Sequence, residues 1–423
     1  SLCFPTTKQH LFPKLRRLNW DGDRSSVTPF LCQLATAPTL NQLTLTSDHP
    51  WDIVALAIIS SLPMACPSLE TITFSRKSIN ENVIPIVSRA ICGWDGLKEV
   101  TSSGLDLEAI RHLARLPSLN ALSFHLPSIA TNQLLQLPGH ESAFQNLRSI
   151  ILDTTDMSTA IVFIKQLHIS LEEFKFTFPV RSSTCGLRDL FKALSDHCDG
   201  SSLKTVWIEE YFDNDSDHGH MPIMDVDIDV IEHLFRFHNL TVLHVDTLGT
   251  YHFDDAAVTQ MAVAWPKLQI LSIGESRCWQ QPSYITLQGL ATFLKLCPNI
   301  SGLTIALDTT NVGGVTLDRP GDGVVGKNLE SLDVLDSKLN QFAIMSIAVF
   351  LSDIGPHVQD INAFGNPYLL RNTIHASTYR DRWESVFLNF LTILKVWNQE
   401  RRWWREHMYD SVELEDEDSE NYY

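Results

Sequence analysis

The sequence has no apolar run long enough to cross a bilayer and no secretory signal pattern at its N-terminus. The longest apolar run, residues 53–64 (IVALAIISSLPM), is well short of the roughly 20 residues that a membrane-spanning helix needs. Basic residues are scarce as well, because 32 Lys and Arg stand against 50 Asp and Glu, a formal net charge of −18. Proteins that bind nucleic acid electrostatically carry the opposite balance. We therefore expect neither a membrane protein nor a nucleic-acid-binding protein.

Cysteine is also sparse, and none of the eight residues forms a CxxC pair. Zinc ribbons and thioredoxin-type redox sites need such pairs, so neither kind of site is expected. Apolar residues make up 44% of the chain and charged residues 19%, which indicates a globular protein rather than a disordered one. A chain of 423 residues can bury a large core without disulfides. We therefore interpret the thiols as reduced and buried, in an intracellular protein of the cytoplasm or nucleus.

One short phrase recurs along the whole chain. It reads FPKLRRLNW from Phe12, CPSLETITF from Cys66 and WPKLQILSI from Trp265, and ten further copies are recognisable. We take as the anchor of each copy the apolar residue that stands fourth in these three phrases, and the anchors are Leu15, Leu40, Leu69, Leu97, Leu119, Leu147, Leu171, Leu203, Leu240, Leu268, Ile300, Leu329 and Val358. Their mean spacing is about 29 residues, which indicates stacked repeats that share one core rather than separate domains.

Each copy of the phrase has the alternation of a short strand. The residue three after the anchor is apolar in all thirteen copies, and the residue two further on is apolar in twelve. Mostly polar residues stand between them, so each strand should bury one face. Helix-like stretches with apolar residues three and four apart separate the strands, for example residues 105–116, 186–198 and 286–297. This alternation predicts an α/β solenoid, a horseshoe with parallel β-strands on its concave face and helices on its convex face.

The C-terminal part of the chain differs from the repeats. Residues 376–408 predict one long amphipathic helix, which we interpret as a cap over the last repeat. Its cluster RRWWR at residues 401–405 could instead contact a partner. Residues 409–423 contain seven acidic and no basic residues, so we expect a disordered tail there. The expected organisation is a solenoid over residues 1–375, a capping helix and an acidic tail.

Two short motifs suggest chemistry but fit it poorly. Residues 213–220 (DNDSDHGH) open like a calcium loop, yet the glycine falls at the seventh place and Met224 stands where a glutamate is needed. His218 and His220 could hold a transition metal instead, which leaves a metal-dependent hydrolase as a remote alternative. Residues 321–326 (GDGVVG) match GxGxxG but precede a strand phrase, whereas a dinucleotide site follows a strand. We therefore expect no catalytic residues, no metal, no cofactor and no enzymatic activity.

The remaining candidate site is the strand face that points away from the helices. Most charged residues on this face are acidic, and Trp207 stands among them. Such a face suits a basic patch on a protein partner, because carboxylates steer association and an aromatic ring anchors it. An ordinary solvated face of an acidic protein would look the same, and this alternative stays open. Ile151 and Phe364 are expected on the same face, and the predicted partner-binding residues are Asp153, Glu173, Trp207, Glu209, His244, Asp246, Asp333 and Asp360.

The repeated phrase, its period and the intervening helices resemble the leucine-rich-repeat family over roughly residues 10–375. Copies such as CPSLETITF and CPNISGLTI, together with the long Trp-containing helix, are most similar to fungal F-box proteins of that family. In those proteins an F-box module precedes the repeats and docks the adaptor of a cullin ubiquitin ligase. The resemblance implies a substrate-recruiting repeat domain of a ubiquitin-ligase receptor; a repeat scaffold or inhibitor without a ligase link is the alternative. Residues 1–10 are too short for an F-box, so the adaptor is an expected partner only if that module lies upstream.

Overall fold

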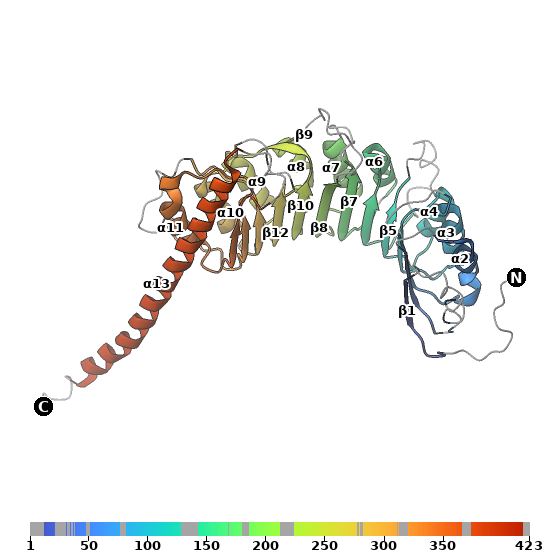
Figure 1. Cartoon of the computed structure of the whole chain (residues 1–423), viewed down its shortest axis with the longest axis horizontal. Coiled ribbons are helices and arrows are strands. Elements are labelled where there is room, and N and C mark those ends of the chain that lie inside the picture. The colour runs from blue at the N-terminus through green and yellow to red at the C-terminus, as the bar shows by residue number, and fades with distance from the viewer. Residues whose placement is uncertain are drawn as a thin grey trace. The chain divides into compact units, whose positions relative to one another are not determined.

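The structure is a computed structural model that describes residues 12–21, 31, 34, 37, 39–47, 51–76, 82–127, 143–167, 169–179, 186–211, 224–276, 279, 282–310, 312, 320–365 and 374–417. The chain forms two compact units. The first comprises Ser1–Met224 with Asp229–Leu248, and the second comprises Asp225–Ile228 with Gly249–Tyr423. Each unit is described by itself below, and Figure 1 labels the elements of both.

In the described part of the first unit, nine parallel strands lie side by side in chain order. They are β1 (Arg17–Asp21), β2 (Gln42–Ser47), β3 (Thr71–Arg76), β4 (Glu99–Ser102), β5 (Ala121–His125), β6 (Ser149–Asp153), β7 (Glu173–Pro179), β8 (Thr205–Tyr211) and β10 (Val242–Asp246). Their pairing places equivalent positions of successive repeats opposite each other, as Leu43 with Ile72 and Ile150 with Phe174. The strand register that the repeated phrase predicts is thus confirmed.

The described part of the second unit has four parallel strands with the same pattern, β12 (Ile270–Ile273), β13 (Gly302–Thr304), β14 (Ser331–Asp333) and β15 (Asp360–Asn362). Leu303 lies opposite Leu332, and Leu332 lies opposite Ile361, so the predicted register holds here too. A separate two-stranded sheet pairs β9 (Met224–Asp227) with β11 (Gly249–His252). The repeated phrase does not predict this small sheet, because it belongs to the connections between repeats.

Helices cover one face of each sheet (Figure 1). The first unit contains α2 (Ile53–Ala65), α3 (Ile84–Ile91), α4 (Leu107–Ala114), α6 (Met157–Lys165), α7 (Gly186–His197), most of α8 (Ile228–Ile231) and the 3₁₀ turn η2 (Glu232–Leu234). The second contains α9 (Asp255–Ala264), α10 (Leu287–Leu296), the 3₁₀ turn η3 (Gln341–Ala343), α11 (Ile344–Ile354) and α13 (Ala376–Glu417). Consecutive helices pack together, as α6 does with α7 and α9 with α10.

An aspartate begins several of these helices. The side chains of Asp52, Asp106, Asp156 and Asp254 each accept a hydrogen bond from a backbone N–H of the first helical turn. This cap satisfies a donor that the helix itself leaves unpaired, and each such cap stabilises a helix by about 1 kcal/mol. The caps therefore fix where each helix starts after its strand.

The buried face of each strand supplies the core. The apolar positions that the sequence alternation predicts are almost completely buried, for example Ile72, Phe174, Leu243 and Leu303. Large rings fill the space between sheet and helices, and the buried Trp94 indole donates a hydrogen bond to the Cys66 carbonyl at 2.9 Å. A buried indole N–H needs a hydrogen-bond partner, and this bond provides one. The bond also holds the Trp94 ring in place and links two successive repeats.

A polar side chain just before the anchor also joins successive repeats. At five copies of the phrase it donates a hydrogen bond to a main-chain carbonyl of the preceding repeat, with distances of 2.6–2.9 Å. Asparagine and hydroxyl side chains are short enough to reach across one strand spacing of roughly 4.8 Å. The donors are Thr39, Ser118, Asn146, Asn239 and Asn328.

The first part of α13 covers the last repeat of the second unit, where it packs against α11 and β15. Trp383 is 1% exposed, and its indole donates a hydrogen bond to the Ser337 carbonyl at 2.8 Å. The rings of Tyr379 and Phe364 stack with centroids 5.6 Å apart. This helix shields apolar side chains that the last repeat would otherwise expose to water.

Two details differ from the expectations raised by the sequence. Phe364 is fully buried instead of lying on the uncovered strand face, because β15 ends at Asn362 and a left-handed backbone (φ 51°) follows at Phe364 itself. The helix α13 extends to Glu417, so residues 409–417 continue it rather than forming part of a disordered tail. No Pro or Gly interrupts residues 376–417, and Glu and Leu are good helix formers.

Leu243→Asp should lower the free energy of unfolding by at least about 4 kcal/mol, because Leu243 is fully buried and an unpaired carboxylate would replace it in the core. Chemical denaturation followed by circular dichroism measures this loss. Val242→Asp is the matched control, since Val242 is the adjacent residue on the uncovered face and is only half-buried. Equal losses in the two variants would contradict the strand register.

Candidate functional site

The described helices lie on one face of each sheet, and we call the opposite face the open face. On the first unit, residues at equivalent positions of β6, β7, β8 and β10 form two rows across the open face. One row consists of Ile151, Lys175, Trp207 and His244, and the next row consists of Asp153, Thr177, Glu209 and Asp246. The parallel register therefore brings together residues that are up to about 90 positions apart in the sequence.

The rings of Trp207 and His244 are stacked, with centroids 3.8 Å apart and planes inclined by 13°. The Trp207 indole also donates a hydrogen bond to Glu209 Oε2 at 3.2 Å. These two contacts fix the tryptophan ring from its face and from its edge. Trp207 remains half-buried, so a fixed aromatic surface is available to a ligand.

The carboxylates beside this ring are held by polar neighbours. Asp153 lies 3.0 Å from His125 Nδ1 and accepts a hydrogen bond from Thr177 at 3.3 Å. Glu173 contacts Lys175 Nζ at 2.8 Å and accepts a hydrogen bond from Ser149 at 2.6 Å.

Partial burial acts to raise the pKa of Glu173, but the hydrogen bonds from Lys175 and Ser149 outweigh it and leave the pKa below its usual range. Glu173 is therefore ionised at neutral pH and forms an ion pair with the Lys175 ammonium.

We define the Trp207 cluster as Asp153, Lys175, Trp207, Glu209, His244 and Asp246. Three carboxylates and one ammonium give this cluster a formal charge of −2 with neutral histidine. His244 and Asp246 are only 5% and 4% exposed, so they support the cluster from within the protein rather than offering contact area. Of the residues predicted in the first unit, Trp207, Glu209, Asp153 and Glu173 remain accessible, and Lys175 joins them.

The two other predicted residues, Asp333 and Asp360, lie on the open face of the second unit. Asp360 Oδ2 accepts hydrogen bonds from Ser331 at 3.2 Å and from Asn362 at 2.7 Å. Asp333 accepts one from the Leu335 N–H at 2.8 Å. The pKa of Asp333 is raised to about 6, chiefly by burial; the hydrogen bond from the Leu335 N–H opposes this rise, and the negative charges of Glu275 and Asp360 add to it.

A ladder of charges that the sequence reasoning missed runs along the N-terminal ends of the strands. Glu172 lies between Arg148 and Lys204, with nitrogen–oxygen distances of 2.5 Å and 2.7 Å, at the edge of an open groove of about 490 Å³. Hydrogen bonds from Lys204 and then Arg148 lower the pKa of Glu172. The signal was present in the sequence, because all three residues directly follow the anchor of their repeat. The groups are largely exposed, so salt weakens their attraction.

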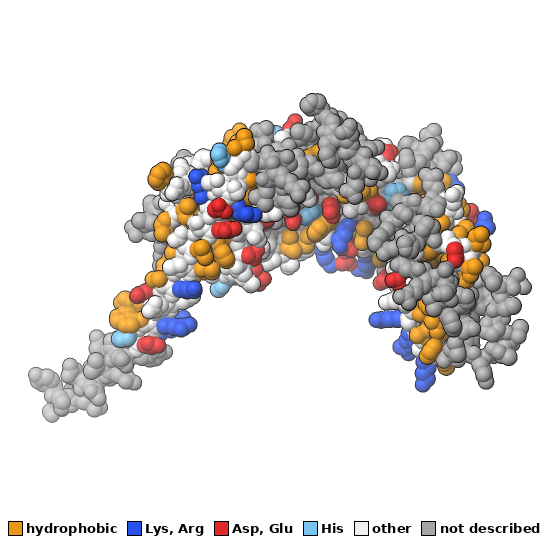
Figure 2. Space-filling model, viewed as in Figure 1, with side chains coloured by type: hydrophobic (Ala, Val, Ile, Leu, Met, Phe, Trp, Pro, Cys, Tyr) orange, Lys and Arg blue, Asp and Glu red, His pale blue; other side chains and the backbone are white. Residues whose placement is uncertain are grey.

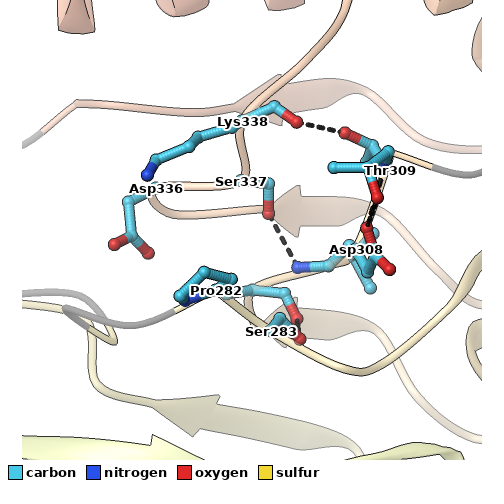
Figure 3. A pocket seen from close by; sticks show the side chains of 10 residues that line it. Pro282, Ser283, Asp308, Thr309, Asp336, Ser337 and Lys338 are labelled. Carbon is cyan, nitrogen blue, oxygen red and sulfur yellow. Dashed lines mark hydrogen bonds between the residues drawn. The ribbon is translucent and has the colours of Figure 1, made fainter.

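A smaller cavity of about 140 Å³ lies between loops of the second unit that follow β13 and β14 (Figure 3). Its polar groups already bind neighbouring loops, since Ser337 Oγ accepts the Leu307 N–H at 2.7 Å and Thr309 Oγ1 donates to the Lys338 carbonyl. Ligand pockets usually measure about 300–1,000 Å³. We therefore interpret this cavity as part of the loop packing.

Of the two short sequence motifs, the structure describes only residues 321–326. Residues 213–220 lie outside the described residues, and among those described no three His, Cys, Asp or Glu side chains could hold a metal ion together. Residues 321–326 form turns that precede β14 and open no helix, as the sequence order predicts. No helix in the described ranges has the length and apolar character needed to cross a membrane.

The cysteines that the structure describes give no sign of a reactive thiol. Cys66, Cys198 and Cys297 are buried and free of disulfides, and burial raises the pKa of each thiol to about 12. A nucleophilic cysteine needs the opposite shift. These three thiols therefore serve as small apolar groups in the core.

No protein-family model and no curated protein matches the sequence. Solved structures with a similar arrangement include an internalin from Listeria monocytogenes, which is 13% identical with a TM-score of 0.38, over 75% of this chain and 86% of the internalin chain. A likeness this low identifies no family, and none of these comparisons supports the F-box resemblance. In each unit, the repeated parallel strands, their register and the helices on one face themselves define an α/β solenoid fold of the leucine-rich-repeat type.

Asp333→Asn should raise the free energy of unfolding near pH 7.5 by about 2–3 kcal/mol. Because of the raised pKa, the Asp333 carboxyl stays protonated up to about pH 6 in the folded protein, whereas in the unfolded chain it loses its proton near pH 4. The protonated Asp333 side chain therefore stabilises the fold below pH 4, and this contribution disappears as the pH rises through 6. The asparagine that replaces it does not ionise, so the variant keeps its stability over this pH range. Its side-chain oxygen can still accept the hydrogen bond from the Leu335 N–H.

Urea denaturation between pH 4 and pH 7.5 measures this difference. Asp322→Asn is the control, because it removes an exposed carboxylate of the same unit. If wild type and Asp333→Asn show the same pH dependence, Asp333 does not titrate as its surroundings imply.

Proposed function

We propose that the chain is a protein-interaction module whose first unit binds a basic segment of a partner protein at the Trp207 cluster. The observation that carries this proposal is the fixed, half-exposed Trp207 ring with Glu209 and Asp153 in the adjacent row of the same open face. Trp is among the residues that most often anchor protein interfaces. An arginine of the partner could contact both the Trp207 ring and the neighbouring carboxylates, since its guanidinium stacks on aromatic rings and pairs with carboxylates.

Binding of a partner should cost the Trp207 side chain little conformational entropy. Side chains that become immobilised on binding lose conformational entropy, which weakens association. The His244 stack and the Glu209 hydrogen bond already hold Trp207 in one orientation, so little of this freedom remains to be lost. A merely solvated face gives no reason for an aromatic ring to be fixed in this way.

The charge of the open face favours a basic partner. On the described strands of the first unit, this face carries six acidic residues against two basic ones, Arg17 and Lys175; the acidic ones are Asp21, Glu99, Asp153, Glu173, Glu209 and Asp246. Complementary charge mainly raises the association rate and falls off with salt. Binding at the cluster should therefore weaken as ionic strength rises.

Trp207→Ala should reduce binding of basic peptides about tenfold or more, because it removes the anchoring ring, while the melting temperature changes little. A peptide array that varies Arg, Lys and Glu content, followed by fluorescence anisotropy with the strongest peptide, measures the effect. Trp403→Ala is the control, since it removes an exposed tryptophan of the second unit.

Two results would contradict the assignment of the site. Unchanged binding by Trp207→Ala would show that the cluster is not the binding surface. Unfolding of this variant would show that the ring serves the core, which would contradict its position on the open face.

The finer hypothesis is that this module recruits substrates for a ubiquitin ligase. It is supported by the resemblance of the repeats and of the C-terminal helix to fungal F-box proteins. Co-purification of the full-length gene product with the ligase adaptor and cullin would support it, whereas absence of both would favour a scaffold or inhibitor without a ligase link. Either outcome leaves the Trp207 cluster as the proposed binding surface.

A further inference from the structure

The distal part of α13 is exposed to solvent over residues 398–407. Trp383, Val386 and Phe390 are buried against the second unit, but every residue of the segment 398–407 is exposed. Trp403 and Trp404 are 49% and 58% exposed, and Figure 2 shows hydrophobic and basic side chains side by side along this part of the helix. Two exposed tryptophans on an unsupported helix are costly in water, because burial of such rings is the main driving force for packing.

The exposed apolar stripe continues the stripe that packs against the second unit. Spacings of three and four connect Tyr379, Trp383, Val386 and Phe390 on the buried side. The same spacing then passes through Ile393, Trp397 and Trp404, with the polar residues Glu400 and His407 at the positions between and after them. Such a seam over a helix of 42 residues is typical of helices that pair with another helix. Val396 and Trp403 widen the stripe, and Trp403 stacks on His407 with centroids 4.3 Å apart.

The charge along this part of α13 is divided into two blocks. Residues 395–405 carry Lys395, Arg401, Arg402 and Arg405 against one acidic residue, a net charge of +3. Residues 406–417, which the same helix includes, carry six acidic residues and no Lys or Arg, a net charge of −6. Two copies of this helix side by side attract each other only when they run antiparallel, because the basic block of one then meets the acidic block of the other.

We propose that α13 is a self-association element, through which two copies of this chain pair by an antiparallel contact of their distal helices. The tryptophan stripe supplies the apolar contact, and the two charge blocks set its direction. A parallel pair would place like charges together along the whole contact. An anionic membrane surface is a poorer occupant of the stripe, because the acidic block directly follows the basic one and would be repelled.

Sedimentation of the full chain over about 1–100 µM measures this association. We expect wild type to dimerise within this range and W403D/W404D to stay monomeric, because the two carboxylates disrupt the apolar contact. Leu388→Asp is the matched control, since Leu388 is 65% exposed on the same helix but lies on the side opposite the stripe, and it should still dimerise. Circular dichroism of all three proteins confirms that the fold is kept.

Two charge-reversal variants test whether the paired helices run antiparallel. R401E/R402E/R405E and E413R/E415R/D416R/E417R should each be monomeric alone, because the first variant makes both blocks acidic and the second makes both blocks basic. Mixed together they should form a heterodimer. Raising NaCl from about 50 to 500 mM should weaken the wild-type dimer about tenfold, whereas a parallel pair would become stronger as repulsion is screened.

Three outcomes would overturn the proposal. A wild-type chain that stays monomeric up to about 100 µM has no self-association element. A dimer that persists in W403D/W404D forms through another surface. A wild-type dimer that salt strengthens is not antiparallel. None of these results affects binding of basic peptides at the Trp207 cluster, so the two proposals can fail separately.

Discussion

The parallel hydrogen-bonded register of successive strands is the constraint on which the other features depend. Because each strand pairs with the next without a shift, a residue type that recurs at one position of the repeat becomes a row in space. The apolar rows form the core, the polar row before the anchor joins repeats, and the uncovered rows form the open face. A slip of one residue would exchange the buried and the open rows at once.

The same register explains how an interaction surface arises without a local motif. Lys175, Trp207 and His244 belong to three different repeats, yet they are consecutive members of one row. Nothing in the sequence near Trp207 reveals its stacking partner. The cluster is therefore a property of neighbouring repeats, and a single substitution can change it without disturbing the core beneath.

The C-terminal helix α13 is a single element whose two parts lie in different surroundings, one buried and one exposed. Its first turns are fixed by burial, through the Trp383 hydrogen bond to Ser337 and the ring stack on Phe364. Its later turns keep the same apolar spacing without any covering element in the described chain. Packing decides which part of a uniform sequence pattern belongs to the core and which part remains available to another molecule.

The sequence by itself determined the repeat, the alternation of strand and helix and the buried strand positions, because periodic burial leaves a periodic pattern of apolar residues. It also placed Trp207, Glu209 and Asp153 on the open face. Only the tertiary structure decided that His244 and Asp246 are buried, that Phe364 turns under Tyr379 and that Arg148, Glu172 and Lys204 form a charge ladder. These features depend on contacts between residues of different repeats or elements, and spacing along the chain does not encode which side chains will cover one another.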